Sequence, residues 1–100
     1  MAAYIFGEIE ITDPAGYEAY RAQVPAIIAA HGGRYLARGG ESQLLEGEGA
    51  PRRVVILEFP SMATLRAFYD APAYQPLKLL RQRCSTGRLV AVEGIPGGPS

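Results

Sequence analysis

The sequence contains one cysteine, one histidine and no tryptophan. A lone cysteine, Cys84, excludes an internal disulfide and any site built from several thiolates, and it suits a reducing compartment. Because no thiolate-stabilising motif surrounds Cys84, we expect a packed thiol without catalytic or metal-binding use. The only histidine, His31, has no carboxylate at ligand spacing on its predicted helix. We therefore expect neither a metal site nor a bound cofactor.

An excess of charge of either sign and a long apolar segment are also missing. Lysine and arginine together number 10, which equals the number of aspartate and glutamate residues. No net field therefore attracts nucleic acid or an anionic membrane. The apolar runs are far shorter than the roughly 20 residues that cross a bilayer, and no basic segment followed by an apolar one opens the chain. We expect a cytoplasmic protein that binds neither nucleic acid nor membranes.

A chain of 100 residues is long enough for one small hydrophobic core. We predict a single domain over residues 1–94. Residues 95–100, rich in glycine and proline, are predicted to form a flexible tail.

The first third of the chain predicts a strand and then a helix. Apolar residues alternate from Tyr4 to Ile11, as in a strand, and Thr12-Asp13-Pro14 is a helix start. Residues spaced by three and four then form one apolar helical stripe that ends before Gly32: Tyr17, Tyr20, Val24, Ile27, Ile28 and His31. Pro25 lies inside this helix and predicts a kink or a broken turn.

The rest of the chain predicts three strands and two helices. A strand over Arg34–Arg38 is interrupted at Gly39-Gly40 and resumes at Gln43–Leu45. The strand Arg53–Phe59 is the most apolar and is therefore expected at the centre of the sheet. The remaining predicted elements are a helix capped by Ser61 that carries Leu65, Phe68 and Tyr69, a helix over Tyr74–Arg83 with Leu77, Leu80 and Cys84 facing inward, and a strand over Arg88–Glu93.

This order, β-α-β-β-α-β, predicts an α+β fold of the ferredoxin-like type, with both helices on one face of an antiparallel sheet. Leucine, valine and isoleucine occur on both faces of the predicted strands. The face away from the helices would therefore expose more apolar surface than a soluble monomer usually does. A second sheet packed there would cover it, so we expect a homodimer that forms a dimeric α+β barrel.

Several motifs, taken together, resemble a family. They are Asp13-Pro14 with Tyr17 and Tyr20, the run from His31 to Gly40, Leu45-Glu46-Gly47, Arg53-Val54-Val55, Glu58-Phe59-Pro60-Ser61, and Tyr69 with Pro72, Tyr74 and Arg81. On these residues the chain is similar to a small single-domain family of unknown function in the dimeric α+β barrel superfamily. The resemblance implies the fold and dimerisation. The wider superfamily includes cofactor-independent monooxygenases, lactone isomerases and haem enzymes, so the fold does not select an activity.

His31 and Arg38 are the candidate catalytic residues. Histidine has an ordinary pKa of about 6.5, so His31 is a candidate general acid or base; the alternative is a histidine that hydrogen-bonds the last helical turn. Arg38 is predicted to share a strand face with Arg34 and Leu36. A buried guanidinium needs a carboxylate or an anionic ligand, so Arg38 either clamps a substrate carboxylate or enolate or pairs internally with Glu8, Glu58 or Glu93.

Four further residues are candidate substrate contacts: Tyr20, Glu58, Tyr69 and Tyr74. The tyrosines would form an aromatic wall whose hydroxyls need hydrogen-bond partners, although aromatic stripes are also typical of a core. Two functions remain open for the predicted pocket. One is a cofactor-independent isomerase or oxygenase acting on a small polarised metabolite, and the other is a homodimeric module that binds a small ligand without catalysis.

Overall fold

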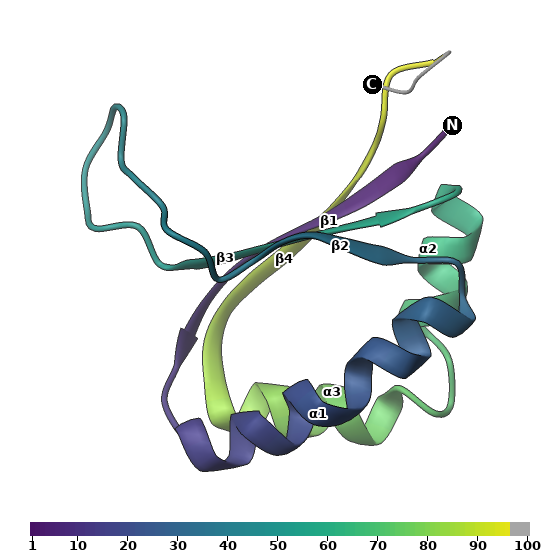
Figure 1. Ribbon diagram of the computed structural model, residues 1–100, viewed down its shortest axis with the longest axis horizontal. Coiled ribbons are helices and arrows are strands. Elements are labelled where there is room, and N and C mark those ends of the chain that lie inside the picture. Colours follow the sequence, from purple (N-terminus) through teal and green to yellow (C-terminus); the bar gives the residue numbers. More distant parts are fainter. Residues whose placement is uncertain (97–100) are drawn as a thin grey trace.

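The computed structural model describes residues 1–96 as one antiparallel sheet with three helices (Figure 1). The elements in chain order are β1 (Ala3–Ile11), α1 (Pro14–Ala30), β2 (Arg34–Arg38), β3 (Arg53–Phe59), α2 (Met62–Tyr69), α3 (Gln75–Cys84) and β4 (Ser85–Glu93). The predicted tail falls mostly on residues 97–100, which lie outside the described residues. No helix among residues 1–96 is long and apolar enough to cross a bilayer.

The strands lie in the order β2-β3-β1-β4, and every neighbouring pair is antiparallel. All three helices lie on one side of this sheet (Figure 1). This is the ferredoxin-like arrangement that the element order predicts. The apolar strand β3 is an interior strand, as expected from its sequence.

Helix α1 begins and ends where its sequence predicts. The Asp13 carboxylate accepts a hydrogen bond from the Gly16 amide at 3.2 Å, which satisfies one unpaired donor of the first turn. Gly32 has φ +76° after the last turn, the left-handed conformation that ends many helices. The helix is continuous through Pro25, so the broken turn predicted there does not occur.

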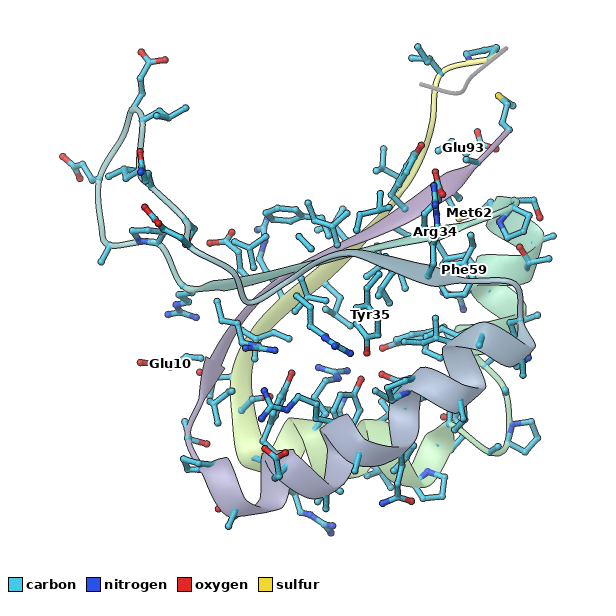
Figure 2. The ribbon with its side chains drawn as sticks, viewed as in Figure 1. Glu10, Arg34, Tyr35, Phe59, Met62 and Glu93 are labelled. Atoms are coloured by element: carbon cyan, nitrogen blue, oxygen red, sulfur yellow. The ribbon has the colours of Figure 1, made fainter. Side chains whose placement is uncertain are left out.

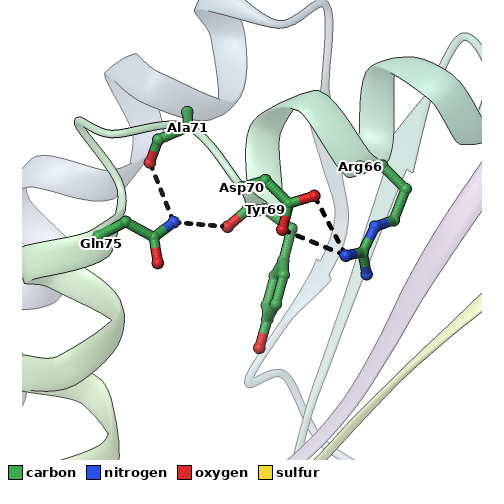
Figure 3. A network of polar contacts seen from close by, with 5 residues as sticks. All are labelled: Arg66, Tyr69, Asp70, Ala71 and Gln75. Carbon is green, nitrogen blue, oxygen red and sulfur yellow. Dashed lines mark hydrogen bonds and ion pairs between the residues drawn. The ribbon is translucent and has the colours of Figure 1, made fainter.

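Helices α2 and α3 are joined by a short turn held by polar contacts (Figure 3). The Gln75 side-chain amide donates to the Tyr69 carbonyl at 3.0 Å and to the Ala71 carbonyl at 3.1 Å. Arg66 pairs with Asp70 one helical turn away at 3.1 Å. The Arg66 guanidinium also lies 5.6 Å from the centre of the Tyr69 ring. These contacts orient Tyr69 and the start of α3.

The main core fills the space between the sheet and the helices. Phe59 is fully buried, and Phe68 stacks on it with ring centres 5.3 Å apart. Phe68 also contacts Tyr74, with 4.5 Å between ring centres. A smaller buried cluster of Ile9, Tyr17 and Cys84 lies beside this core. Burial of these aromatic rings provides much of the hydrophobic stabilisation of the domain.

Two predicted strand boundaries are wrong. Gln43–Leu45 does not rejoin the sheet but lies in an exposed loop, because the edge strand β2 makes its last sheet contact when the Gly39 amide donates to the Val54 carbonyl. Strand β4 begins at Ser85, three residues before the predicted start, and Ser85 pairs with Ile11. Ser85-Thr86-Gly87 has the composition of a turn, but pairing with the long strand β1 overrides it.

Candidate functional site

A cavity of about 40 Å³ lies between the sheet and the helices. One water needs roughly 10–15 Å³ of such space, so the cavity has room for a few waters. Its lining is apolar and aromatic except for four arginines. The lining residues are Ile5, Ile9, Tyr17, Tyr20, Arg21, Val24, Ile28, Tyr35, Arg38, Arg53, Val55, Leu57, Phe68, Tyr69, Tyr74, Arg81 and Leu89.

Tyr20, Tyr69 and Tyr74, which the sequence predicts as an aromatic wall, all line this cavity. The Tyr20 and Tyr74 hydroxyls share a hydrogen bond of 2.9 Å between their oxygens. Tyr74 contacts Tyr69 as well, with ring centres 5.9 Å apart. Burial, together with the neighbouring Tyr74, raises the pKa of Tyr20 well above the usual range. Tyr20 therefore stays protonated, and one proton of the Tyr20–Tyr74 pair remains free to donate to a ligand.

A β-bulge places Arg38 beside the cavity. The register between β2 and β3 shifts between Tyr35 and Ala37, so that Tyr35 pairs with Leu57 and Arg38 pairs with Val55. The extra residue puts Tyr35 and Arg38 on the same side of the sheet. Figure 2 shows Tyr35 directed toward the helices and Arg34 directed away from them. The prediction that Arg38 shares a face with Arg34 is therefore wrong.

The guanidinium of Arg38 lies 4.5 Å from the centre of the Tyr35 ring, within the range of a cation–π contact. Burial raises the pKa of Tyr35, and Arg38 opposes that rise. None of the predicted carboxylate partners pairs with Arg38 among residues 1–96. The side chain of Arg38 is exposed, which places it at the rim of the cavity.

Arg53 and Arg81 are half-buried and add two positive charges to the site. The Arg53 guanidinium lies 5.8 Å from the centre of the Tyr17 ring and against Gly39, where a Cβ atom would come within 2.0 Å of a guanidinium nitrogen. The Nε atoms of Arg53 and Arg81 are buried without a hydrogen-bond partner among residues 1–96. Burial lowers the pKa of Arg81, but the nearby Tyr74 and other tyrosines more than offset this, so its pKa is raised.

Two predicted site residues lie elsewhere. His31 does not line the cavity; its Nδ1 lies 2.9 Å from the Ile27 carbonyl, and its ring contacts Phe68 edge-on at 6.1 Å. Glu58 accepts a hydrogen bond of 2.7 Å from Arg34. Because Glu58 pairs with Tyr4 in β1, it lies on the face of the sheet opposite the cavity. Neither residue is brought together with Arg38.

Sequence reasoning missed Arg21, Arg53 and Arg81 as lining residues. Two of them carry a signal in their spacing. Arg21 follows Tyr17 by four residues on α1, and Arg81 follows Leu77 by four residues on α3, so each lies on the inward side of its helix. The position of Arg53 carries no comparable signal, since its access depends on Gly39, the residue that follows β2.

The described residues 1–96 contain no group of three or more histidine, cysteine, aspartate and glutamate side chains that could hold a metal ion. Cys84 is buried, and its Sγ donates a long hydrogen bond of 3.9 Å to the Asp13 carboxylate. This thiol packs the start of α1 against the end of α3.

A comparison with protein families identifies the chain. Residues 2–95 match the model of a domain of unknown function, DUF1330. The chain belongs to this family. No curated protein matches the chain, so the DUF1330 assignment rests on the family model.

Solved structures with the same fold are similar to this DUF1330 chain over nearly its whole length. The RPA0582 protein of unknown function from Rhodopseudomonas palustris has a TM-score of 0.77 and 18% identity, covering 94% of this chain and 82% of its own. SnoaB, a cofactor-independent oxygenase from Streptomyces nogalater, has a TM-score of 0.65 and 16% identity, with 99% and 98% covered.

A third similar structure is a dimeric ferredoxin-like protein of unknown function from Jannaschia sp. CCS1, with a TM-score of 0.61 and 17% identity, covering 94% of this chain and 100% of its own. Identities this low establish the fold alone. The ferredoxin-like architecture of the DUF1330 chain is thereby confirmed.

Proposed function

We propose that this protein is a cofactor-independent enzyme, an isomerase or an oxygenase, that acts on a small polarised metabolite in the cavity between sheet and helices. The observation that carries the proposal is the lining of the cavity, which combines tyrosine hydroxyls with three arginines that no carboxylate among residues 1–96 neutralises. Such groups stabilise the negative charge that develops on an oxygen atom in a transition state. The likeness to SnoaB, a cofactor-independent oxygenase, supports the reaction class.

Arg38 is the residue that we assign to the developing oxyanion. It lies at the rim beside Tyr35, and its planar guanidinium matches a carboxylate or enolate in two-pronged geometry. Tyr20, Tyr69 and Tyr74 would position the substrate, with the free proton of the Tyr20–Tyr74 pair donated to a substrate oxygen.

The cavity lining supplies no ordinary general base. It contains no histidine, cysteine, aspartate, glutamate or lysine of the described residues 1–96, and His31 lies outside it. In an enzyme of this design, a water molecule or the substrate itself would take the proton. The same observation favours the second candidate function, a module that binds a small ligand and catalyses nothing.

A ligand screen separates the two functions. We would measure the melting temperature of the purified chain against a library of small metabolites, because a ligand that binds only the folded state raises it. Each stabilising compound would then be incubated with the protein, and oxygen uptake and isomerisation would be followed by an oxygen electrode and by NMR. Turnover that Arg38→Met abolishes and that Arg83→Met, at an exposed residue outside the lining, spares supports an enzyme. Stabilisation without turnover supports the binding module, and the absence of any stabilising compound contradicts both.

We also propose that the protein is a homodimer assembled through the face of the sheet that the helices leave free. Four large apolar side chains from β1, β2 and β4 are exposed there: Phe6 (36%), Leu36 (49%), Val90 (41%) and Val92 (51%). Phe6 pairs with Ile56 on one side and with Val90 on the other, so the apolar side chains form one continuous patch. A second copy of the same sheet would cover it.

A further inference from the structure

Residues 1–96 do not balance the positive charge of the cavity lining. Arg38, Arg53 and Arg81 line it, and none of the three is in an ion pair among residues 1–96. The fourth lining arginine, Arg21, pairs with Glu18. A guanidinium does not lose its proton in a protein. The cavity therefore carries three positive charges for which residues 1–96 provide no counter-ion.

Two of these guanidinium groups also have one buried donor without a hydrogen-bond acceptor. Arg53 Nε and Arg81 Nε are both buried and unpaired within residues 1–96. A buried donor without an acceptor destabilises the folded state, and more so when the donor is charged. Anionic oxygens in the cavity would supply the missing acceptors and the missing charge together.

Shared neighbours connect Arg38, Arg53 and Arg81 in the cavity lining. Arg53 pairs with Ile9 in β1 and lies near Tyr17, and both of these neighbours belong to the small buried cluster that contains Cys84. Arg81 precedes Cys84 by one helical turn. Arg38 is joined to this group because the Arg53 guanidinium lies against Gly39, the residue that follows Arg38.

The rest of the lining is apolar and aromatic. Ile28, Leu57 and Phe68 line the cavity and belong to the main core. Tyr74 belongs to the main core too, and Tyr20, with which it shares a hydrogen bond, packs against both buried clusters. The cavity thus offers guanidinium groups, hydroxyls and an apolar surface.

We infer that the ligand of this cavity is a compact organic dianion, with two acidic groups that pair with the arginines and a short apolar skeleton. The inference rests on the proposed small-molecule site and specifies the ligand class. Two negative charges are assigned because three uncompensated guanidinium groups surround a small volume, and one carboxylate would leave two of them unpaired. The volume of about 40 Å³ restricts the ligand to a short carbon skeleton.

Binding of an isosteric series would test the charge. Malonate, malonamate and malonamide have the same skeleton and carry two, one and no negative charges at neutral pH. We would titrate each into the full chain by calorimetry at constant ionic strength, since salt screens such contacts. We expect malonate to bind at least about tenfold more tightly than malonamate, and malonamide to bind most weakly. Sulfate, a dianion without a carbon skeleton, is expected to bind more weakly than malonate.

Arginine variants would locate the site. Arg53→Met and Arg81→Met keep most of the apolar stem and remove the charge. Each is expected to weaken malonate binding at least about tenfold and to narrow the difference between malonate and malonamate. Arg83→Met is the matched control, because Arg83 is exposed, lies two residues after Arg81 on α3 and does not line the cavity. Circular dichroism would establish that each variant is folded, and Arg53→Lys would replace a variant that is not.

Three outcomes would overturn the inference: malonamide or malonamate binding as tightly as malonate, sulfate binding as tightly as malonate, or no measurable binding of malonate at millimolar concentration. An equal loss of binding in Arg83→Met would overturn the assignment to the cavity. Because these experiments measure binding without turnover, a protein that prefers malonate and catalyses nothing would uphold the dianion site while contradicting the proposed enzyme. A catalyst that prefers neutral ligands would do the reverse.

Discussion

At the scale of single residues, the burial of Tyr20, together with its contact with Tyr74, makes the stability of the fold depend on pH. In an unfolded chain a tyrosine ionises with a pKa of about 10, whereas burial raises the pKa of Tyr20 in the folded chain. Above pH 10 the unfolded state therefore binds fewer protons than the folded state, and the free energy of unfolding falls as the pH rises. Below pH 10, Tyr20 is protonated in both states, so its contribution to the free energy of unfolding is fully present.

Tyr20→Phe tests this linkage. At neutral pH we expect the variant to be less stable than the wild type by about 1 kcal/mol, because the Tyr74 hydroxyl loses its partner. The difference should shrink as the pH rises above 10, since the variant has no buried hydroxyl at residue 20 to keep protonated. Urea unfolding of both proteins between pH 7 and about pH 11 would measure it. A difference that is constant over this range would contradict the assigned cause.

Gly39 is the residue that admits the Arg53 guanidinium to the cavity. It has φ +72°, and a Cβ atom there would overlap Arg53. Gly47 also has a positive φ, +107°, but nothing lies within 4 Å of its missing Cβ. A side chain at Gly47 would strain only the backbone, whereas a side chain at Gly39 would strain the backbone and also overlap Arg53.

We predict that Gly39→Ala destabilises the fold by more than Gly47→Ala does. Both substitutions add about 1 kcal/mol or more of backbone strain, but only Gly39→Ala displaces Arg53. Thermal melting of the two variants would give the comparison, and anion titration would show whether Arg53 has moved. Equal melting temperatures would mean that Arg53 does not need the space beside Gly39.

At the scale of elements, helix α2 depends on its first turn. The Ser61 side chain accepts a hydrogen bond from the Thr64 amide at 3.1 Å, and the Thr64 hydroxyl accepts one from the Ser61 amide at 3.1 Å. This reciprocal pair satisfies two amides that have no partner within the helix. It starts a short helix that places Leu65 and Phe68 in the core.

We predict that Ser61→Ala lowers the free energy of unfolding by about 1 kcal/mol, which is a fall of about 4–8 °C in melting temperature for a domain of this size. Ser42→Ala, in the exposed loop after β2, is the matched control and should leave the melting temperature unchanged. If Ser61→Ala had the wild-type melting temperature, water would satisfy the amides of the first turn as well as Ser61 does.

At the scale of the whole molecule, the sheet has one covered face and one bare face. The helices cover one side (Figure 1), and the apolar patch around Phe6 lies on the other. The loop between β2 and β3 projects away from the helices and carries Leu45 at 88% exposure. A partner sheet on the bare face would remove this apolar surface from water.

Phe6→Glu tests the dimer. A charge in the middle of a sheet-to-sheet interface would lose its hydration, so we expect this variant to sediment as a monomer at a micromolar concentration at which the wild type is a dimer. Leu79→Glu makes the same change at an apolar side chain that is 58% exposed on α3, on the helical side, and should remain a dimer. Wild-type protein that sediments only as a 10.7 kDa species would contradict the proposed assembly.

The sequence by itself determined the elements and their order. The alternation in β1, the Asp13 and Ser61 caps and the stripe on α1 all act over a few residues, and local geometry decides them. The tyrosine wall followed from the same periodicity, because residues three or four apart share a helix face. For the same reason, errors appeared where no local signal exists, as at Ser85, whose pairing depends on β1.

Only the tertiary structure decided which charges surround the cavity. One extra residue at the β2 bulge moved Arg38 to the helical side of the sheet, since side chains in a strand change face with every residue. Arg53 has its place because Gly39, which follows β2, leaves room for it, and the strand register puts Glu58 on the opposite face, where it pairs with Arg34. These positions depend on register and on contacts between distant segments, and a single sequence encodes them only through the folded chain.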